Sequence, residues 1–111
     1  MNVYSVKPTR QAEAQMRDIA WHIAVELHNP DAAENLMDEF GEAFETLGKN
    51  PEKHEPVDEK PWHSEGVRKT RVKHYLIYFW IDVENAAVQI MGIVYERRDQ
   101  KKFLSKMNMT D

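Results

Sequence analysis

The sequence predicts an α+β fold with the order β-α-α-β-β-β, in which a helix hairpin packs on one face of a small antiparallel sheet. Two observations predict it. Apolar residues recur at three- and four-residue spacing over 12–47, and short segments rich in β-branched and aromatic residues follow Gly66. The length of 111 residues fits a single domain spanning 1–111.

The N-terminal half carries the strand and the hairpin. Residues 2–7 include β-branched and aromatic residues and stop at Pro8, so they are expected to form a short strand. Thr9 offers an N-cap for a helix that ends near His28. Asn29-Pro30 then supplies a new cap and a first helical residue for a second helix that closes around Gly48. The short connection predicts that the two helices lie antiparallel.

The C-terminal half carries the rest of the sheet. Residues 49–65 read as a loop with three prolines, and strands are expected over 67–72, 75–82 and 87–95. The last two strands are apolar on both alternating faces, which predicts that both faces are covered. The hairpin covers one face. The other is left for a partner or for the segment 99–111, where Phe103, Leu104 and Met107 fit one side of a short helix.

Composition excludes several classes of protein. There is no cysteine, so a disulfide scaffold, a thiolate zinc site and a cysteine nucleophile are excluded. The histidines and carboxylates show no metal-ligand spacing, and neither a metal nor a cofactor is expected. The longest apolar run, 75–81, is far below a membrane span, and charges in the first twenty residues fit no signal peptide. A soluble, cytoplasmic protein with no membrane partner is therefore expected.

The net charge of −4 is unevenly distributed. Residues 1–59 hold five basic and thirteen acidic side chains, for a net −8, whereas residues 60–111 hold ten basic and six acidic ones, for a net +4. Such asymmetry is typical of a charged partner on one face, although solvated outer faces of acidic helices give the same pattern.

Basic side chains gather at two places, on the second strand and just past the last strand. They are Arg68, Lys69, Arg71 and Lys73, and Arg97, Arg98, Lys101 and Lys102. If both strands end at the same edge of the sheet, the clusters converge and could bind a phosphate backbone or stabilise its cleavage. The alternatives are an edge strand guarded by cations and a structural pair of Arg98 with Asp99. His63 and His74 flank the basic strand and are the candidate general acids or bases.

Several short motifs occur together in order. They are Tyr-x-Val at the start, Asn-Pro-x-Ala-Ala over 29–33, Leu-x-x-x-Pro over 47–51, Gly-x-Arg over 66–68, Tyr-Leu-Ile-Tyr over 75–78 and Tyr-x-Arg-Arg-Asp over 95–99. In this arrangement the chain resembles the RelE/ParE toxin superfamily of bacterial type II toxin–antitoxin modules over about residues 2–104. The resemblance implies the fold derived above, growth arrest by the free toxin and neutralisation by a cognate antitoxin.

The superfamily contains metal-independent endoribonucleases that cut mRNA in the ribosome and a branch that poisons DNA gyrase. For a nuclease, the resemblance suggests Arg68 and Arg98 as catalytic residues, and His74, which flanks the basic strand, is the third candidate. Arg71, Lys73 and Arg97 are the target-binding candidates. However, Leu76 stands where nuclease members often have an arginine, and Phe103 or Leu104 stands near their late catalytic tyrosine. Unless His63, His74 or Tyr95 substitutes, efficient cleavage is not expected, so the sequence favours a gyrase poison and leaves enzymatic activity open.

Two alternatives stay open beside the gyrase poison. One is a ribosome-dependent endoribonuclease, and the other is a degenerate toxin that only binds the antitoxin. In each case we expect the antitoxin to dock on an uncovered face and edge of the sheet, at Met91 and Ile93 of the last strand. The cellular target, the identity of the antitoxin and the oligomeric state are not determined by the sequence.

Overall fold

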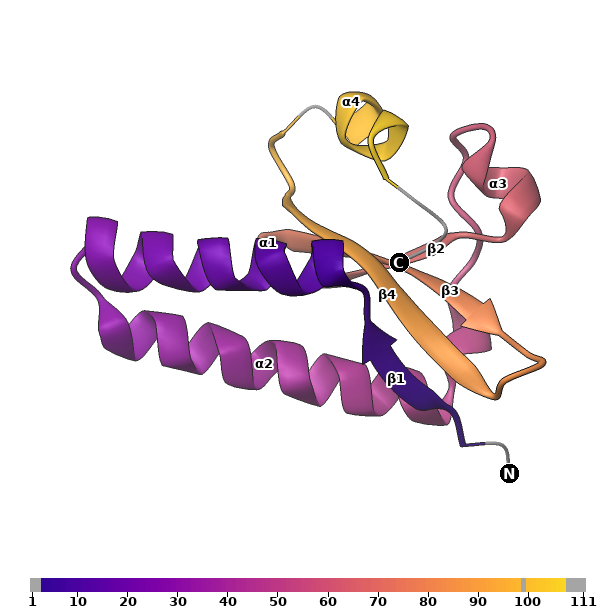
Figure 1. Cartoon of the computed structure of the whole chain (residues 1–111), viewed down its shortest axis with the longest axis horizontal. Helices are drawn as coiled ribbons and strands as arrows, with labels where there is room; N and C mark the ends of the chain where they lie inside the picture. The colour runs from indigo at the N-terminus through magenta and orange to yellow at the C-terminus, as the bar shows by residue number, and fades with distance from the viewer. Residues whose placement is uncertain (1–2, 99, 108–111) are drawn as a thin grey trace.

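The computed structural model describes residues 3–98 and 100–107 (Figure 1). The predicted order β-α-α-β-β-β is confirmed, with short helical turns added between the main elements. In chain order these are β1 (Ser5–Pro8), α1 (Arg10–Trp21), a π-helical turn (His22–Glu26), α2 (Pro30–Lys49), a 3₁₀ turn (Pro51–Lys53), α3 (Trp62–Glu65), β2 (Arg68–Val72), β3 (Tyr75–Asp82), β4 (Ala87–Tyr95) and α4 (Gln100–Ser105).

Both predicted helix caps of the hairpin are confirmed. The Thr9 hydroxyl accepts a hydrogen bond from the Ala12 amide at 3.1 Å, and the Asn29 side chain accepts one from the Ala32 amide at 3.2 Å. Each cap satisfies an amide that the first helical turn leaves without a partner. Among the described residues, no helix combines the length and the apolar character needed to cross a membrane.

The sheet has the strand order β1-β4-β3-β2. β2, β3 and β4 are antiparallel as predicted, but β1 pairs with β4 in parallel, from Ser5 opposite Ala87 to Pro8 opposite Ile90. The prediction of a wholly antiparallel sheet was therefore wrong for β1. The reason is that α2 returns the chain to the start of β1, where the Tyr4 amide donates to the Gly48 carbonyl at 2.7 Å. The three strands that follow alternate in direction, so β2 and β4 run in the same direction as β1 and β3 runs opposite to it.

Each face of the sheet carries its own apolar cluster. The α1–α2 hairpin covers one face, with Leu36 and Phe40 packed on Ile77, Phe79 and other buried residues of the sheet. On the other face, Leu104 and Met107 of the C-terminal segment are buried together with residues of the α3 region (Figure 1). The apolar side expected for the C-terminal helix is confirmed, and the second face is covered by the chain itself.

A β-bulge changes the expectation for Met91 and Ile93. Tyr78 pairs with Gly92 and Phe79 with Ile90, so Met91 is an extra residue in β4. The bulge shifts the alternation, and Met91 belongs to the cluster under α4 whereas Ile93 faces the hairpin. They are 0% and 2% exposed. The prediction that they lie on an uncovered face was wrong, because this chain's own helices bury both.

Candidate functional site

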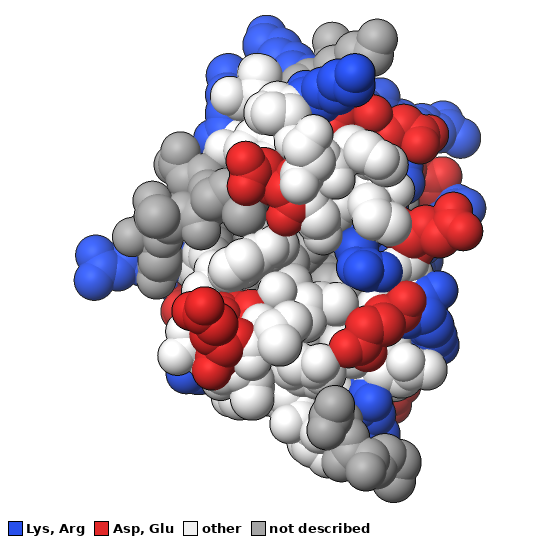
Figure 2. Space-filling model, turned by 90° about the vertical axis from the view of Figure 1, so that its right-hand side faces the viewer, with Lys and Arg blue, Asp and Glu red and all other residues white. Residues whose placement is uncertain are grey.

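The C-terminal ends of β2 and β4 lie at the same end of the sheet, because both strands run antiparallel to β3. The condition for convergence of the two basic segments is therefore met near the end of β2, by Arg71 and Lys73. We call the resulting surface the cationic end and define it by the side chains of Arg71, Lys73, His74, Arg97 and Arg98. The opposite end of the molecule, with α3 and the β3–β4 turn, carries acidic and basic residues intermixed (Figure 2).

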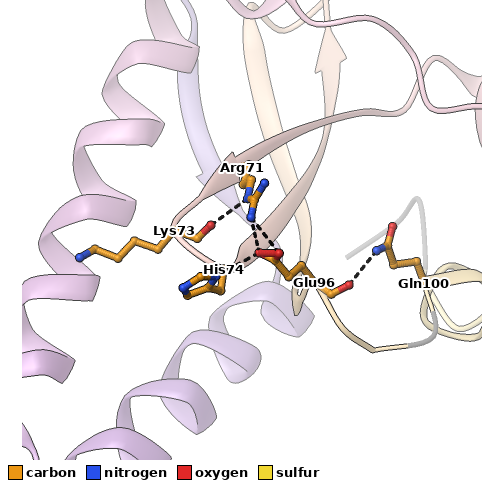
Figure 3. A network of polar contacts seen from close by, with 5 residues as sticks. All are labelled: Arg71, Lys73, His74, Glu96 and Gln100. Carbon is orange, nitrogen blue, oxygen red and sulfur yellow. Dashed lines mark hydrogen bonds and ion pairs between the residues drawn. The ribbon is translucent and has the colours of Figure 1, made fainter.

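A carboxylate that the sequence did not single out lies at the centre of this surface (Figure 3). Nη2 of Arg71 donates to both carboxylate oxygens of Glu96, at 2.8 and 2.7 Å, and His74 Nδ1 lies 3.3 Å from Oε2 of the same group. Arg71 Nε also donates to the Lys73 carbonyl at 2.9 Å. Glu96 therefore neutralises Arg71, the cation of this surface that these hydrogen bonds hold in place.

Backbone contacts on both sides fix the position of Glu96. Its amide donates to the His74 carbonyl at 2.8 Å, and its carbonyl accepts from Gln100 Nε2 at 3.0 Å. The Gln100 side chain also accepts a hydrogen bond from the Tyr78 hydroxyl at 3.3 Å. The backbone of residue 96 is thus tied to the β2–β3 turn on one side and to α4 on the other.

Lys73 connects the cationic end to the helix hairpin. It occupies the β2–β3 turn with φ +52°, and its Nζ lies 3.5 Å from a carboxylate oxygen of Glu39 on α2. Lys73 and Glu39 are both partly exposed to solvent, so this pair contributes little to stability. Arg97 and Arg98 are exposed beyond the end of β4.

Arg68 lies at the other end of β2, opposite Phe79, and does not join the cationic end. Its Nη1 donates to the main-chain carbonyls of Glu52, at 3.2 Å, and His54. These contacts hold the loop that follows α2. Of the candidate catalytic residues, the structure therefore places His74 and Arg98 at the cationic end and gives Arg68 a contact with the loop backbone instead.

The groups available for proton transfer are limited by their surroundings. Burial, with a smaller effect of the Glu59 charge, raises the pKa of Tyr78 to about 12. Burial also raises the pKa of Tyr75, whose ring packs edge-on against Tyr95. His63 is engaged through Nδ1 with the Val57 carbonyl at 2.8 Å. Tyr75 and Tyr78 therefore stay protonated at neutral pH.

The apolar residues near the position of a late catalytic tyrosine have a structural role. The Phe103 ring stacks on Tyr78 with a centroid separation of 5.9 Å, and the neighbouring α4 residue Leu104 is 1% exposed. Neither side chain can donate or accept a proton. Together they fasten α4 to the sheet.

The hairpin carries an apolar groove of about 470 Å³, whose lining includes none of the residues that define the cationic end. It is lined by Pro8, Glu13, Met16, Arg17, Ala20 and Met37. The helical stripes predicted Met16, Ala20 and Met37 as apolar positions, but not that they would border a groove.

Comparisons with known proteins agree with this architecture. A family model described as the ParE toxin of the type II toxin–antitoxin system parDE matches residues 6–100. The solved structure of the chromosomal ParDE system from P. aeruginosa is 23% identical, with a TM-score of 0.67, over 86% of this chain and 98% of that chain. The RelBE2 toxin–antitoxin complex from Mycobacterium tuberculosis is 21% identical, with a TM-score of 0.59, over 84% and 98%. A search of curated proteins gives no match. Because the family model covers most of the sequence, the chain belongs to the ParE toxin family of type II toxin–antitoxin systems.

Proposed function

We propose that this chain arrests growth in the cytoplasm by acting on DNA gyrase, and that a cognate antitoxin neutralises it. The observation that carries the choice of target is that, among the described residues, several groups that a metal-independent nuclease would use are engaged elsewhere or replaced by apolar side chains. Arg68 holds main-chain carbonyls, Arg71 is paired with Glu96, and the late positions 103 and 104 are apolar and packed on the sheet.

The energetics of cleavage support this choice. A positioned general acid or base contributes roughly 10²–10⁴-fold to the rate of a reaction. At about 1.4 kcal/mol for each factor of ten, its loss removes roughly 3–5 kcal/mol of transition-state stabilisation. The remaining candidates at the cationic end are His74, whose ring contacts Glu96, and Arg98, which can supply charge but no proton at neutral pH.

Inducing the chain in bacteria without its antitoxin tests the proposal. We expect filamentous cells and DNA breaks, with full-length mRNA in a translating extract. Codon-phased mRNA cuts that Arg98→Ala weakens would instead establish a ribosome-dependent endoribonuclease. Normal growth with retained antitoxin affinity would establish a degenerate toxin that acts only as a binding module.

The groove on the hairpin is the surface we propose for the antitoxin, in place of the buried Met91 and Ile93. Its apolar lining by Met16, Ala20 and Met37 fits the apolar stripe of an amphipathic helix. Ala20→Glu places a charge in the groove and is expected to weaken antitoxin binding at least tenfold. Ala14→Glu, on the same helix but outside the groove lining, is the matched control. Equal affinities of the two variants would place the antitoxin elsewhere.

A further inference from the structure

We propose that Glu96 acts as an internal counter-ion that keeps nucleic acid away from the cationic end of the sheet. The inference rests on the proposed function, because it names the residue that separates a toxin with a protein target from one that binds a polyanion. Nucleic-acid affinity depends on cations that replace the counterions of the phosphate backbone. A cation that is already paired within the protein releases fewer of these counterions when nucleic acid binds.

The contact geometry places the compensating charge where a phosphate would bind. Arg71 Nη2 lies 2.8 and 2.7 Å from the two Glu96 oxygens, so a phosphate oxygen that approached this nitrogen would have to compete with the carboxylate. The same carboxylate lies 3.3 Å from His74 Nδ1 (Figure 3). Glu96 is 26% exposed, against 59% for Arg71 and 70% for His74, so it lies deeper than the groups it contacts.

Without the Glu96 charge, this surface would be strongly basic. From β2 and the turn that follows it, Arg71 and Lys73 contribute two cations to this surface. Arg97 and Arg98 add two more cations directly after Glu96. Among the described residues, the second carboxylate with a contact to this surface is Glu39, which reaches Lys73 from α2 rather than Arg71. Glu96 is therefore the described carboxylate that pairs with Arg71 and His74.

Glu96→Gln removes the negative charge of residue 96 and keeps the contacts that hold its backbone. The two backbone contacts of residue 96, with His74 and Gln100, do not depend on the side chain. The glutamine amide oxygen still accepts a hydrogen bond from Arg71. Glu84→Gln, in the β3–β4 turn at the opposite end of the sheet, makes the same change in net charge and is the matched control.

The experiment measures binding of a fluorescent single-stranded 20-nucleotide RNA over a range of salt concentrations. One added phosphate contact steepens the slope of log K against log salt by about 0.7, which is about fivefold in affinity between 1 M and 0.1 M salt. We therefore expect Glu96→Gln to bind the RNA about fivefold more tightly than the natural chain at 0.1 M salt, with the steeper slope. Adding Arg71→Gln to Glu96→Gln should cancel the gain, and Glu84→Gln should show none.

Three outcomes would overturn the proposal. They are unchanged RNA affinity in Glu96→Gln, an equal gain in Glu84→Gln, and a gain that survives loss of Arg71. Glu96→Ala, which keeps the same backbone contacts, gives a second measurement if Glu96→Gln unfolds. The gyrase target is tested separately on the natural chain, so a failure of the Glu96 proposal leaves the result of the gyrase test unaffected. Conversely, RNA cleavage by the natural chain would overturn the proposed gyrase target. It would not change the comparison of RNA affinities between the variants.

Discussion

Gly92 is the position in β4 where the packing of α4 is most sensitive to a single added carbon. A Cβ at this residue would lie 2.7 Å from Cζ and 2.9 Å from Cε2 of Phe103. Ordinary carbon–carbon contacts are about 3.5–4.0 Å, so the ring must move by roughly 1 Å. Because this ring stacks on Tyr78, the movement disturbs the attachment of α4 to the sheet.

The expected cost of Gly92→Ala follows from these contacts. Overpacking a filled site costs about 1–3 kcal/mol, and replacing a strand glycine recovers about 0.5–1 kcal/mol of backbone entropy. The net loss of unfolding free energy is about 1–2 kcal/mol, which lowers Tm by roughly 4–8 °C in a domain of this size. Urea unfolding followed by tryptophan fluorescence measures it, because Trp62 and Trp80 pack against the cluster under α4.

Two further variants make the measurement specific. Gly41→Ala makes the same substitution in α2, where nothing lies within 4 Å of the added Cβ, and it should stabilise the chain by about 0.5–1 kcal/mol. Combining Gly92→Ala with Phe103→Ala should remove the clash, so the double variant should be no less stable than Phe103→Ala alone. Full stability of Gly92→Ala, or a loss that persists without the Phe103 ring, would refute this account of how α4 is held.

Two other predictions concern the segment where α2 returns to the sheet. Gly48→Ala places a Cβ 2.9 Å from the Tyr4 carbonyl oxygen, a backbone atom that cannot rotate away, and should lower the unfolding free energy by about 1–3 kcal/mol in urea titrations; unchanged stability would contradict it. Burial, aided by the charges of Lys53 and Arg68, lowers the pKa of His54. The unfolded chain therefore protonates His54 at a higher pH than the folded chain does. The unfolding free energy should fall as pH drops below about 6.5, and His54→Gln should lose less unfolding free energy between pH 7.5 and 5. An equal loss in the variant would show that His54 does not contribute.

The elements set by local signals could be predicted from the sequence. Strands 75–82 and 87–95 are confirmed residue for residue, because the polar pair Glu84-Asn85 marks the turn between their apolar runs. The Thr9 and Asn29 caps are confirmed for the same reason, since capping depends on residues within one helical turn.

Features that depend on distant pairing could not be predicted in the same way. The parallel alignment of β1 is set by the return of α2 to Tyr4, and the bulge at Met91 is set by the register with β3. The contact of Arg71 with Glu96 joins residues 25 positions apart. An acidic residue directly after the last strand was the available signal for Glu96, but it becomes informative only once the ends of β2 and β4 are known to meet.

A supercoiling assay with purified gyrase tests most directly whether gyrase is the target of the free toxin. The natural chain, separated from its antitoxin, is added to gyrase and relaxed plasmid, and the products are resolved on a gel. If gyrase is the target, we expect that supercoiling is inhibited and that cleaved plasmid accumulates, and that the antitoxin reverses both effects. Normal supercoiling with intact plasmid at toxin concentrations that arrest growth would contradict it.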